Sequence, residues 1–500
     1  MSGLATQSVI AVIGAGTMGA GIAQVAAQAG HPVRLFDVAE GAANKSLDGI
    51  GRQLAKRVEQ GKLEDAKREA VLSRLSSVAS LEELEGCALV IEAIVERLDV
   101  KQALFQRLET ICGERTILAT NTSSLSVTAI GSTLERPERL VGMHFFNPAP
   151  VMKLVEVVTG LATSAEVAET IRLTSAAWGK IPVLATSTPG FIVNRVARPF
   201  YAEALRLLQE QAASPATIDA VIREAGGFRM GPLELTDLIG QDVNAAVTRS
   251  VFDANYGDPR YKPSLIQEEL VSAGRLGRKT GQGFYDYREG VDRPLPDSLP
   301  SGPAPAAISA YGDLGPAEPL LARLAQAGVK VERSDGSGYL EVEGARLALS
   351  DGRTATERAA EEGVLDLVLF DLALDYGIAS RLAVTAADQA APAALDAVAG
   401  LLQAAGLVVS RVDDAPGLVV LRTVSMLANE GYEAVHQGVC DMAAVDEAMR
   451  YGTNYPRGPL AWAEELGAGY VWRVLDHLYQ AYGEDRYRPS ILLRRMAAVG

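Results

Sequence analysis

The chain has 500 residues, which is too long for a single hydrophobic core and indicates roughly two to four domains. Hydrophobic residues make up 48% of it and charged residues 22%, as in an ordinary soluble globular protein. The net charge of −15 disfavours nucleic acid and anionic membranes as the main partners. These values leave a soluble enzyme or binding protein as the class to test.

Cysteine and histidine are both scarce in the chain. The three cysteines form no CxxC pair, which fits a reducing compartment better than a disulfide scaffold. With only four histidines, a metal site is not expected. No secretory signal is visible, and the apolar run 364–379 contains three aspartates, so it is no membrane span. We expect a cytoplasmic protein without a metal.

A glycine-rich motif lies near the start of the chain. Residues 8–13 form a short β-branched run typical of a buried strand, and Gly-Ala-Gly-Thr-Met-Gly follows at 14–19. A helical pattern then extends to residue 29, a second strand covers 32–36, and Asp37 ends that strand. A lone GxGxxG is weak, but strand, glycines, helix, strand and acid at this spacing predict a dinucleotide-binding βαβ unit.

Each residue of this motif has a physical reason. The first glycine permits a tight turn, the second lets a pyrophosphate approach the backbone, and the third lets the helix pack on the sheet. Asp37 can accept both ribose hydroxyls, and its charge repels a 2′-phosphate, so NAD is preferred over NADP. FAD is the main competitor for this fold. The residues predicted to hold NAD here are Gly14, Gly16, Thr17, Met18, Gly19 and Asp37.

The rest of the chain divides by pattern. Strands and helices alternate up to about residue 185, long helical stretches follow, and a Pro-, Gly- and Ser-rich segment comes next. The predicted fold is an α/β Rossmann-like domain plus a duplicated all-α domain, with a small α/β block between the two helical copies. The predicted boundaries are 1–187 for the NAD-binding domain, 188–290 for the first helical domain, 291–316 for a linker, 317–411 for an α/β block without a phosphate loop, and 412–500 for the second helical domain.

The duplication rests on an internal repeat. Pro-Gly-Phe-Ile-Val at 189–193 is echoed by Pro-Gly-Leu-Val-Val at 416–420, and Gly-Pro-Leu at 231–233 by the same letters at 458–460. The spacing between matching segments stays almost constant along the helical domain, which chance does not produce. We therefore expect the second copy to pack against the first, giving a pseudo-dimeric monomer or a homodimer.

Residues 39–75 form a charged helical segment with six or more basic side chains. Such a segment is either a solvated helical hairpin or a basic surface beside a phosphorylated ligand such as CoA. The pattern alone does not choose between these two interpretations.

Four polar residues follow predicted strands or begin helices in a manner that suits alcohol oxidation. A neutral imidazole such as His144 can take the hydroxyl proton as hydride leaves the same carbon. Glu156 lies on the next strand, from which its carboxylate can fix the ring tautomer. Ser123 and Asn194 are neutral hydrogen bonders that can hold an oxygen whose charge changes.

The segments Asn-Thr-Ser-Ser-Leu (121–125), His-Phe-Phe-Asn-Pro (144–148) and Pro-Gly-Phe-Ile-Val-Asn-Arg (189–195) resemble the L-3-hydroxyacyl-CoA dehydrogenase family. The resemblance runs from residue 8 to 290. It implies an NAD-dependent oxidation of an acyl-CoA substrate, (S)-3-hydroxyacyl-CoA to 3-oxoacyl-CoA. It also implies His144 as acid/base, Glu156 as its partner, Ser123 and Asn194 as substrate-positioning residues, and four further cofactor residues: Glu96, Lys101, Asn147 and Lys279.

The order of domains resembles the long bacterial form of this family, which serves phenylacetate degradation and oxidises 3-hydroxyadipyl-CoA. 3-Hydroxybutyryl-CoA stays open as the substrate. Two other classes also stay open: a non-catalytic NAD- or CoA-binding structural protein, and a CoA-independent hydroxyacid dehydrogenase. The second helical copy carries Leu421 where the first has Asn194, so we expect one active site per chain.

Overall fold

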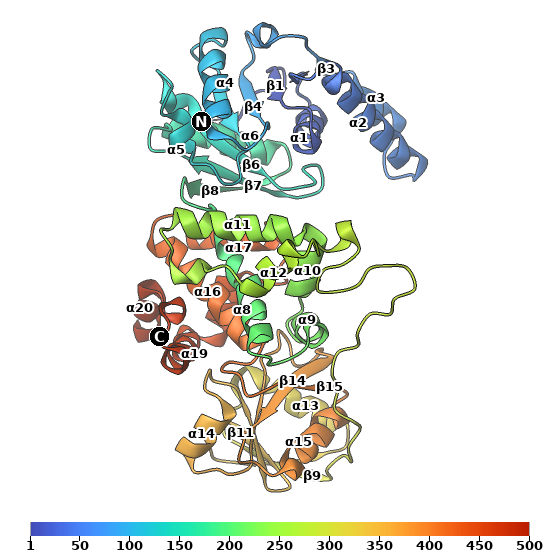
Figure 1. Cartoon of the computed structure of the whole chain (residues 1–500), viewed down its shortest axis with the longest axis vertical. Helices are drawn as coiled ribbons and strands as arrows, with labels where there is room; N and C mark the ends of the chain where they lie inside the picture. Colours follow the sequence, from blue (N-terminus) through green and yellow to red (C-terminus); the bar gives the residue numbers. More distant parts are fainter. Residues whose placement is uncertain (1, 500) are drawn as a thin grey trace. The chain divides into compact units, whose positions relative to one another are not determined.

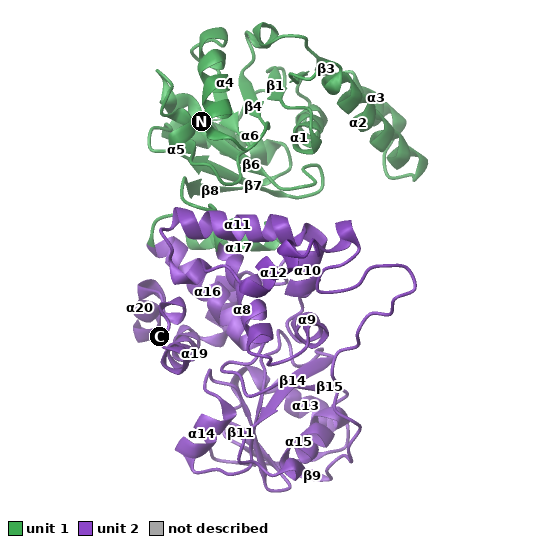
Figure 2. Ribbon diagram, in the orientation of Figure 1, with its two compact units in different colours: residues 1–195, 437–453 green, residues 196–436, 454–500 purple. Residues whose placement is uncertain are grey.

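The computed structural model describes residues 2–499 and divides them into two compact units (Figures 1 and 2). Unit 1 contains the residues up to 195 together with 437–453. Unit 2 contains 196–436 and 454–499. The prediction that 412–500 forms one separate helical domain therefore differs from the structure, because part of that segment belongs to unit 1. Within the described residues, no helix is long and apolar enough to cross a membrane.

Unit 1 is built on an eight-stranded sheet with the order β3-β2-β1-β4-β5-β6-β7-β8. All of its neighbours pair in parallel except β6 and β7, which are antiparallel. The strands are β1 (Ile10–Ile13), β2 (Val33–Phe36), β3 (Leu75–Ser77), β4 (Leu89–Glu92), β5 (Ile117–Thr120), β6 (Leu140–Phe145), β7 (Leu154–Thr159) and β8 (Ile181–Thr186).

The central strands are apolar on both faces because helices cover the sheet on both sides. All four residues of β1, Ile-Ala-Val-Ile, are buried, and so are those of β4 and β5. The helices and turns of this unit are α1 (Thr17–Gln28), α2 (Ala42–Glu59), α3 (Asp65–Leu72), η1 (Leu81–Leu84), α4 (Leu98–Ile111), α5 (Val127–Gly131), η2 (Pro137–Arg139), α6 (Ala165–Ala177), α7 (Val193–Val196, at the boundary with unit 2) and α17 (Met442–Gly452).

The sheet order reverses beside β1, which has β2 on one side and β4 on the other. In such sheets the crevice at the carboxyl ends of the strands next to this point is where ligands bind. The glycine-rich loop follows β1, Glu92 ends β4, and the predicted Asn-Thr-Ser-Ser segment follows β5. The fold therefore brings two of the predicted motifs, together with Glu92, to one edge of the sheet.

Unit 2 combines helices with a second sheet of seven strands in the order β10-β9-β11-β12-β13-β14-β15. Strand β9 lies inside the predicted linker 291–316, so the α/β block begins earlier than expected. The prolines that precede this short strand made the whole segment resemble a linker. The strands are β9 (Ala307–Tyr311), β10 (Lys330–Ser334), β11 (Tyr339–Val342), β12 (Ala345–Leu349), β13 (Leu367–Phe370), β14 (Arg381–Ala386) and β15 (Val408–Arg411).

The helices of unit 2 repeat along the chain. The first series is α8 (Arg198–Gln209), α9 (Pro215–Glu224), α10 (Pro232–Ile239), α11 (Gln241–Ala254), η3 (Pro259–Tyr261), α12 (Leu265–Ser272) and η4 (Arg278–Thr280). Within the sheet block lie η5 (Gly315–Ala317), α13 (Pro319–Gln326), α14 (Ala355–Glu362) and α15 (Pro392–Ala404). The second series is α16 (Val420–His436), α18 (Pro459–Leu466), α19 (Ala468–Tyr482), η6 (Asp485–Tyr487) and α20 (Ile491–Val499), and α17, which lies between α16 and α18 in the chain, belongs to unit 1.

The repeat also extends into the α/β block, which the sequence patterns did not reveal. Strands β12 to β15 follow one another with the same pairing directions as β5 to β8: parallel, antiparallel, parallel. The sequence offset from β7 to β14 equals the offset from α6 to α15, and it matches that of the helical repeat. The block is thus a shortened second copy of the sheet half that carries His144 and Glu156.

The two helical series contact each other inside unit 2, as expected from the repeat. Buried Arg422 on α16 donates to Glu203 Oε2 on α8 at 2.8 Å. The hydroxyl of Tyr261 donates to Glu430 Oε1 at 2.6 Å. These buried contacts join helices from the first and the second copy, so the prediction that the copies pack together is confirmed.

Candidate active site

His144 and Glu156 lie directly opposite each other on the antiparallel strands β6 and β7. Opposite residues of such a pair point to the same face of the sheet. His144 Nδ1 is 2.6 Å from Glu156 Oε2, and both side chains are buried. The strand-to-strand pairing predicted from the sequence is confirmed.

The Glu156 carboxylate has a second set of partners. Its Oε1 accepts hydrogen bonds from the backbone N–H groups of Ile192 and Val193, at 3.0 and 2.9 Å. An ionised carboxylate can only accept hydrogen bonds. The contact with Glu156 therefore requires the proton of this pair to be on His144 Nδ1. Glu156 fixes both the imidazole and the start of the helical segment after β8.

The other ring nitrogen of His144, Nε2, makes no hydrogen bond within the described residues. Phe146 and Phe191 flank the ring, with centroids 4.6 and 5.8 Å from that of the imidazole. These aromatic contacts hold the ring plane while Glu156 holds Nδ1. The arrangement presents an oriented Nε2 lone pair, which is the requirement for a general base.

Ser123 and Asn194, the two residues expected to position the substrate, lie close together. The side-chain amide of Asn194 is 3.5 Å from the carbonyl oxygen of Ser123. The Ser123 N–H donates to Glu96 Oε1 at 2.9 Å, and its hydroxyl is 3.4 Å from the same oxygen. Glu96 therefore orders the loop that carries Ser123.

Glu96 is one member of a buried ionic network after β4. Lys101 Nζ is 2.6 Å from Glu92 Oε1 and 3.2 Å from Glu96 Oε2, and the lysine side chain is only 1% exposed. Burial raises the pKa of Glu96, but the hydrogen bond from Thr122 and the charge of Lys101 outweigh it, so the pKa is lowered. Lys101 thus acts here by holding two carboxylates, whereas the Glu96 side chain is 35% exposed.

The glycine-rich loop fits a bound dinucleotide. A Cβ on Gly14, whose φ is +99°, would lie 2.5 Å from the carbonyl oxygen of Ala93, and one on Gly19 would lie 1.7 Å from that of Gly14. These two glycines are required by the protein itself. A Cβ on Gly16 would meet nothing within 4 Å, so the space beside it is open for a ligand. Helix α1 begins next to it without a side-chain cap, leaving its first N–H groups for an anion.

Asp37 faces this loop from the end of β2. Its Oδ2 accepts the N–H of Ala15 at 2.7 Å, and its Oδ1 accepts the N–H of Ala39 at 2.9 Å. Each carboxylate oxygen keeps a further lone pair for a ribose hydroxyl. The residue therefore both fixes the loop and has capacity left for a ligand.

The remaining predicted cofactor residues have different settings. Asn147 lines a cavity of about 260 Å³ together with Gly16, Thr17 and residues of α1 and α2, which places it with the loop. Lys279 belongs to unit 2, where its Nζ is 2.6 Å from Asp242 Oδ1 and the side chain is 44% exposed.

Helix α17, from the second helical copy, packs on β7 and β8. Before it, the carbonyl of Val439 accepts the N–H of Thr186 at 2.9 Å. Gly452 ends the helix, and a Cβ there would lie 2.6 Å from Leu154 Cδ2 and 3.1 Å from Val193 Cγ2. The second copy therefore supplies a wall directly behind the strand that carries Glu156.

Sequence reasoning missed Glu92, Thr122 and α17 as parts of this site. Glu92 carried a readable signal, because a charged residue ending the buried run Leu-Val-Ile must have a partner. Thr122, which donates to Glu96 Oε1 at 2.6 Å, lay within a recognised segment without an assigned role. No local sequence pattern indicates that α17, which belongs to the second helical copy, packs in unit 1.

Comparison with known proteins assigns the chain to a family. The family model described as "3-hydroxyacyl-CoA dehydrogenase, NAD binding domain" matches residues 9–188, and the corresponding C-terminal domain model matches twice, at 190–287 and 417–500. A curated relative from Escherichia coli (strain K12), named 3-hydroxyadipyl-CoA dehydrogenase, is 46% identical over 98% of this chain and 97% of its own length. The chain belongs to the 3-hydroxyacyl-CoA dehydrogenase family.

Further matches agree with this family. A crystal structure of 3-hydroxybutyryl-CoA dehydrogenase from E. coli K12 is 45% identical, with a TM-score of 0.90 over 99% of both chains. The human mitochondrial hydroxyacyl-coenzyme A dehydrogenase is 43% identical over 56% of this chain and 91% of its own. A "3-hydroxybutyryl-CoA dehydrogenase reduced Rossmann-fold domain" model matches 347–416, in the block between the helical copies. The dehydrogenase is thus an NAD-dependent oxidoreductase, and the predicted family, cofactor and reaction class are confirmed.

Proposed function

We propose that this dehydrogenase oxidises (S)-3-hydroxyadipyl-CoA to 3-oxoadipyl-CoA. The observation that supports the proposal is the similarity to the E. coli relative named 3-hydroxyadipyl-CoA dehydrogenase, which extends over nearly the whole of both chains. The shared length matters, because shorter family members cover only about half of this chain (56%). The place of the reaction in phenylacetate degradation stays a prediction.

In the proposed reaction, His144 Nε2 takes the proton of the substrate C3 hydroxyl. In the imidazolium that forms, Nδ1–H still donates its hydrogen bond to Glu156. The Glu156 carboxylate stabilises the new positive charge across the 2.6 Å contact. Ser123 and Asn194 hold the C3 oxygen as it becomes a carbonyl. The bound nicotinamide supplies the hydride acceptor.

The residues proposed to hold NAD divide by task. Gly16 and the start of α1, including Thr17 and Met18, receive the pyrophosphate, and Asp37 receives the adenosine ribose. Glu96 and Asn147 are proposed to lie against the nicotinamide half. Lys101 supports Glu96 from its buried position, and Lys279 is proposed as the one cofactor residue from unit 2.

A second substrate is favoured by a specific observation. The crystal structure with a TM-score of 0.90 is that of a 3-hydroxybutyryl-CoA dehydrogenase, at nearly the same identity and coverage. The two substrates differ in the far end of the acyl chain, a carboxylate in one and a methyl group in the other. The site residues that act on C3 are common to both.

The test is a comparison of kcat/KM in the reducing direction, by the loss of NADH absorbance at 340 nm. 3-Oxoadipyl-CoA, acetoacetyl-CoA and a long-chain 3-oxoacyl-CoA are compared under one set of conditions. We expect the highest kcat/KM with 3-oxoadipyl-CoA. An equal or higher value with acetoacetyl-CoA assigns the butyryl substrate instead.

The basic hairpin of α2 and α3 is proposed to receive the phosphates of CoA. Six of its cations are exposed, on α2, on α3 and in the loop between them: Lys45, Arg52, Lys56, Arg57, Lys62 and Lys67. Competition by free CoA tests this, since a solvated hairpin predicts no inhibition. A cytoplasmic location is proposed from the sparse, unpaired cysteines.

A further inference from the structure

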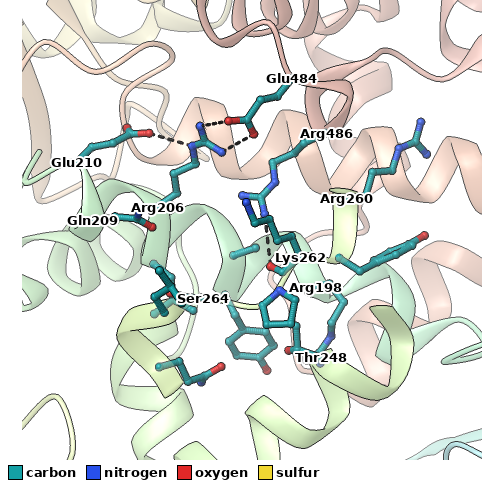
Figure 3. Close-up of a pocket in the computed structure, with 17 residues that line it drawn as sticks. Arg198, Arg206, Gln209, Glu210, Thr248, Arg260, Lys262, Ser264, Glu484 and Arg486 are labelled. Atoms are coloured by element: carbon teal, nitrogen blue, oxygen red, sulfur yellow. Dashed lines mark hydrogen bonds and ion pairs between the residues drawn. The ribbon is translucent and has the colours of Figure 1, made fainter. Parts of the chain in front are cut away.

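A cavity of about 310 Å³ lies within unit 2, and all of its lining residues follow Asn194 in the chain. Its wall is formed by α8, α11 and the η3 segment of the first helical copy, and by the η6 region of the second (Figure 3). It therefore lies on the seam between the two copies. None of its lining residues belongs to the site described above.

The lining is strongly cationic for a chain whose net charge is −15. The lining contains two carboxylates, Glu210 and Glu484, and five basic side chains: Arg198, Arg206, Arg260, Lys262 and Arg486. Arg206 binds both carboxylates, at 2.9 Å to Glu210 and 2.7 Å to Glu484, and Figure 3 shows these ion pairs together at one side. Four cationic side chains remain in the lining beyond this cluster.

Two of these cations, Arg260 and Arg486, lie at long ion-pair distances from carboxylates behind the lining. Arg260 Nη1 is 3.5 Å from Glu433 and 3.8 Å from Glu430, and Arg486 Nη1 is 3.8 Å from Glu203. These distances exceed those of direct charge-assisted hydrogen bonds. Arg260 and Arg486 are nevertheless only 5% and 6% exposed, so their charges are largely removed from water. Such a setting favours an anion in the adjoining space.

Two polar atoms of the lining residues lack a partner. Arg260 Nε and Ser264 Oγ are buried without a hydrogen bond among the described residues. A buried unsatisfied donor is unfavourable unless a ligand or water completes it. Burial also lowers the pKa of the nearby Arg198 guanidinium, whose Nη1 donates to Thr248 at 3.0 Å.

We propose that this cavity binds a small phosphorylated molecule, with its phosphate or pyrophosphate group among Arg198, Arg260, Lys262 and Arg486. Guanidinium groups match phosphate oxygens in geometry, and a phosphate concentrates the negative charge that this lining lacks. Tyr201 and Leu205 add apolar surface for the organic part. Because both helical copies line the cavity, the bound molecule stabilises their packing.

The test uses inorganic pyrophosphate as the probe and isothermal titration calorimetry on the full chain, saturated with NADH to fill the dinucleotide site. We expect one binding event and a rise in Tm on adding pyrophosphate. The variant combines Lys262→Gln and Ser264→Ala, because Lys262 is exposed and Ser264 Oγ makes no hydrogen bond to lose. Its Kd for pyrophosphate should rise about tenfold or more.

The matched control is Arg495→Gln, an exposed cation of the same unit that does not line the cavity. It removes the same charge and should leave the Kd within about twofold. Without pyrophosphate, both variants should have the Tm of the parent protein. The proposal is overturned if the parent protein does not bind pyrophosphate, or if the cavity variant and the control bind it equally well.

Discussion

Asp371 stands in the second half of the chain at the position that His144 occupies in the first, at the same sequence offset that separates β14 from β7. His144 lies on β6 opposite Glu156 on β7. Asp371 follows β13, and its N–H donates to the carbonyl of Ala383 on β14 at 3.0 Å. Ala383 corresponds to Glu156 at this same offset. The proposed catalytic pair of one half is thus replaced by Asp and Ala in the other.

The replacement keeps the structural task of the pair and removes the chemical one. Glu156 accepts the N–H groups of Ile192 and Val193 from β7, whereas Asp371 Oδ2 accepts those of Val419 and Val420 from the end of β13. The carboxylate that accepts these two backbone N–H groups therefore lies, in the second half, at the position that corresponds to His144. With no imidazole at that position, and with Leu421 in place of Asn194, the second half carries no second copy of the catalytic set.

Asp371→Asn should change how stability depends on pH. Burial raises the pKa of the Asp371 carboxyl to about 6, although four backbone N–H groups oppose this. The folded chain then holds a proton between pH 3.8 and 6 that the unfolded chain releases. This contribution is fully present below pH 3.8 and is lost as the pH rises through 6, by about 3 kcal/mol in total. Urea unfolding of parent and variant from pH 4 to 8 measures it.

The free energy of unfolding of the parent protein, relative to the variant, should fall across that range. Asp219, whose pKa burial raises to about 7, contributes in the same direction in both proteins and cancels in the difference. Asp388→Asn, an exposed aspartate of the same block, serves as the control. A constant difference between the parent and Asp371→Asn from pH 4 to 8 contradicts the expectation.

His144→Gln should remove most of kcat and leave NADH binding in place. The loss of a general acid/base costs on the order of 10²–10⁴-fold in rate. Stopped-flow or steady-state turnover with 3-oxoadipyl-CoA measures kcat, and fluorescence titration measures the Kd for NADH. A variant with the parent kcat excludes His144 as the base.

Asp37→Asn should weaken the preference for NAD over NADP by removing the charge that repels a 2′-phosphate. Asn keeps a side-chain oxygen for the N–H of Ala15, which Asp37 Oδ2 accepts at 2.7 Å, so the loop is retained. Asp37→Ala loses both effects and shows how much the loop contact contributes. The ratio of kcat/KM with NADH and NADPH is the measurement, and an unchanged ratio in both variants removes Asp37 from cofactor selection.

The parts of the molecule that were predictable share a local cause. The βαβ unit, the catalytic pair and the helical duplication each rest on residues that are close in sequence or repeated in register. His144 and Glu156 could be paired because they fall on consecutive strands of the chain. Short-range patterns also gave the hairpin of β11 and β12 around Glu343 and Gly344.

The parts that were not predictable depend on contacts far apart in sequence. Strands β12 to β15 of the α/β block repeat the pairing of β5 to β8, but the block has lost the residues that made the first copy recognisable. Helix α17 joins unit 1 through packing that its amphipathic pattern does not encode. Lys101 was placed at the cofactor by resemblance, while its burial depends on Glu92, whose partner no spacing rule names.

Lys101→Met should destabilise the protein by leaving the buried Glu92 carboxylate uncompensated. Removing one partner of a buried ion pair costs about 3–5 kcal/mol. The double variant Glu92→Gln/Lys101→Met removes both charges and should recover part of that loss. Urea unfolding of the two single variants and the double variant gives the coupling free energy. Additive losses would mean that the 2.6 Å contact carries no net interaction.

Gly452→Ala tests whether the second helical copy positions the catalytic pair. The added Cβ would lie 2.6 Å from Leu154 Cδ2 and 3.1 Å from Val193 Cγ2. Leu154 is two residues before Glu156 on β7, and the Val193 N–H is one of the donors to Glu156. A small displacement there reaches His144 through Glu156, so kcat should fall about threefold to tenfold, with a shifted pH profile of kcat/KM.

The matched control for Gly452 is Gly469→Ala on α19, where a Cβ meets nothing within 4 Å. It makes the same chemical change in a helix of the same copy and should leave kcat and its pH profile unchanged. A loss of stability in Gly452→Ala with the parent pH profile would reduce α17 to a packing element. A shifted profile in Gly452→Ala alone would show that the copy without catalytic residues still determines how the base of the other is held.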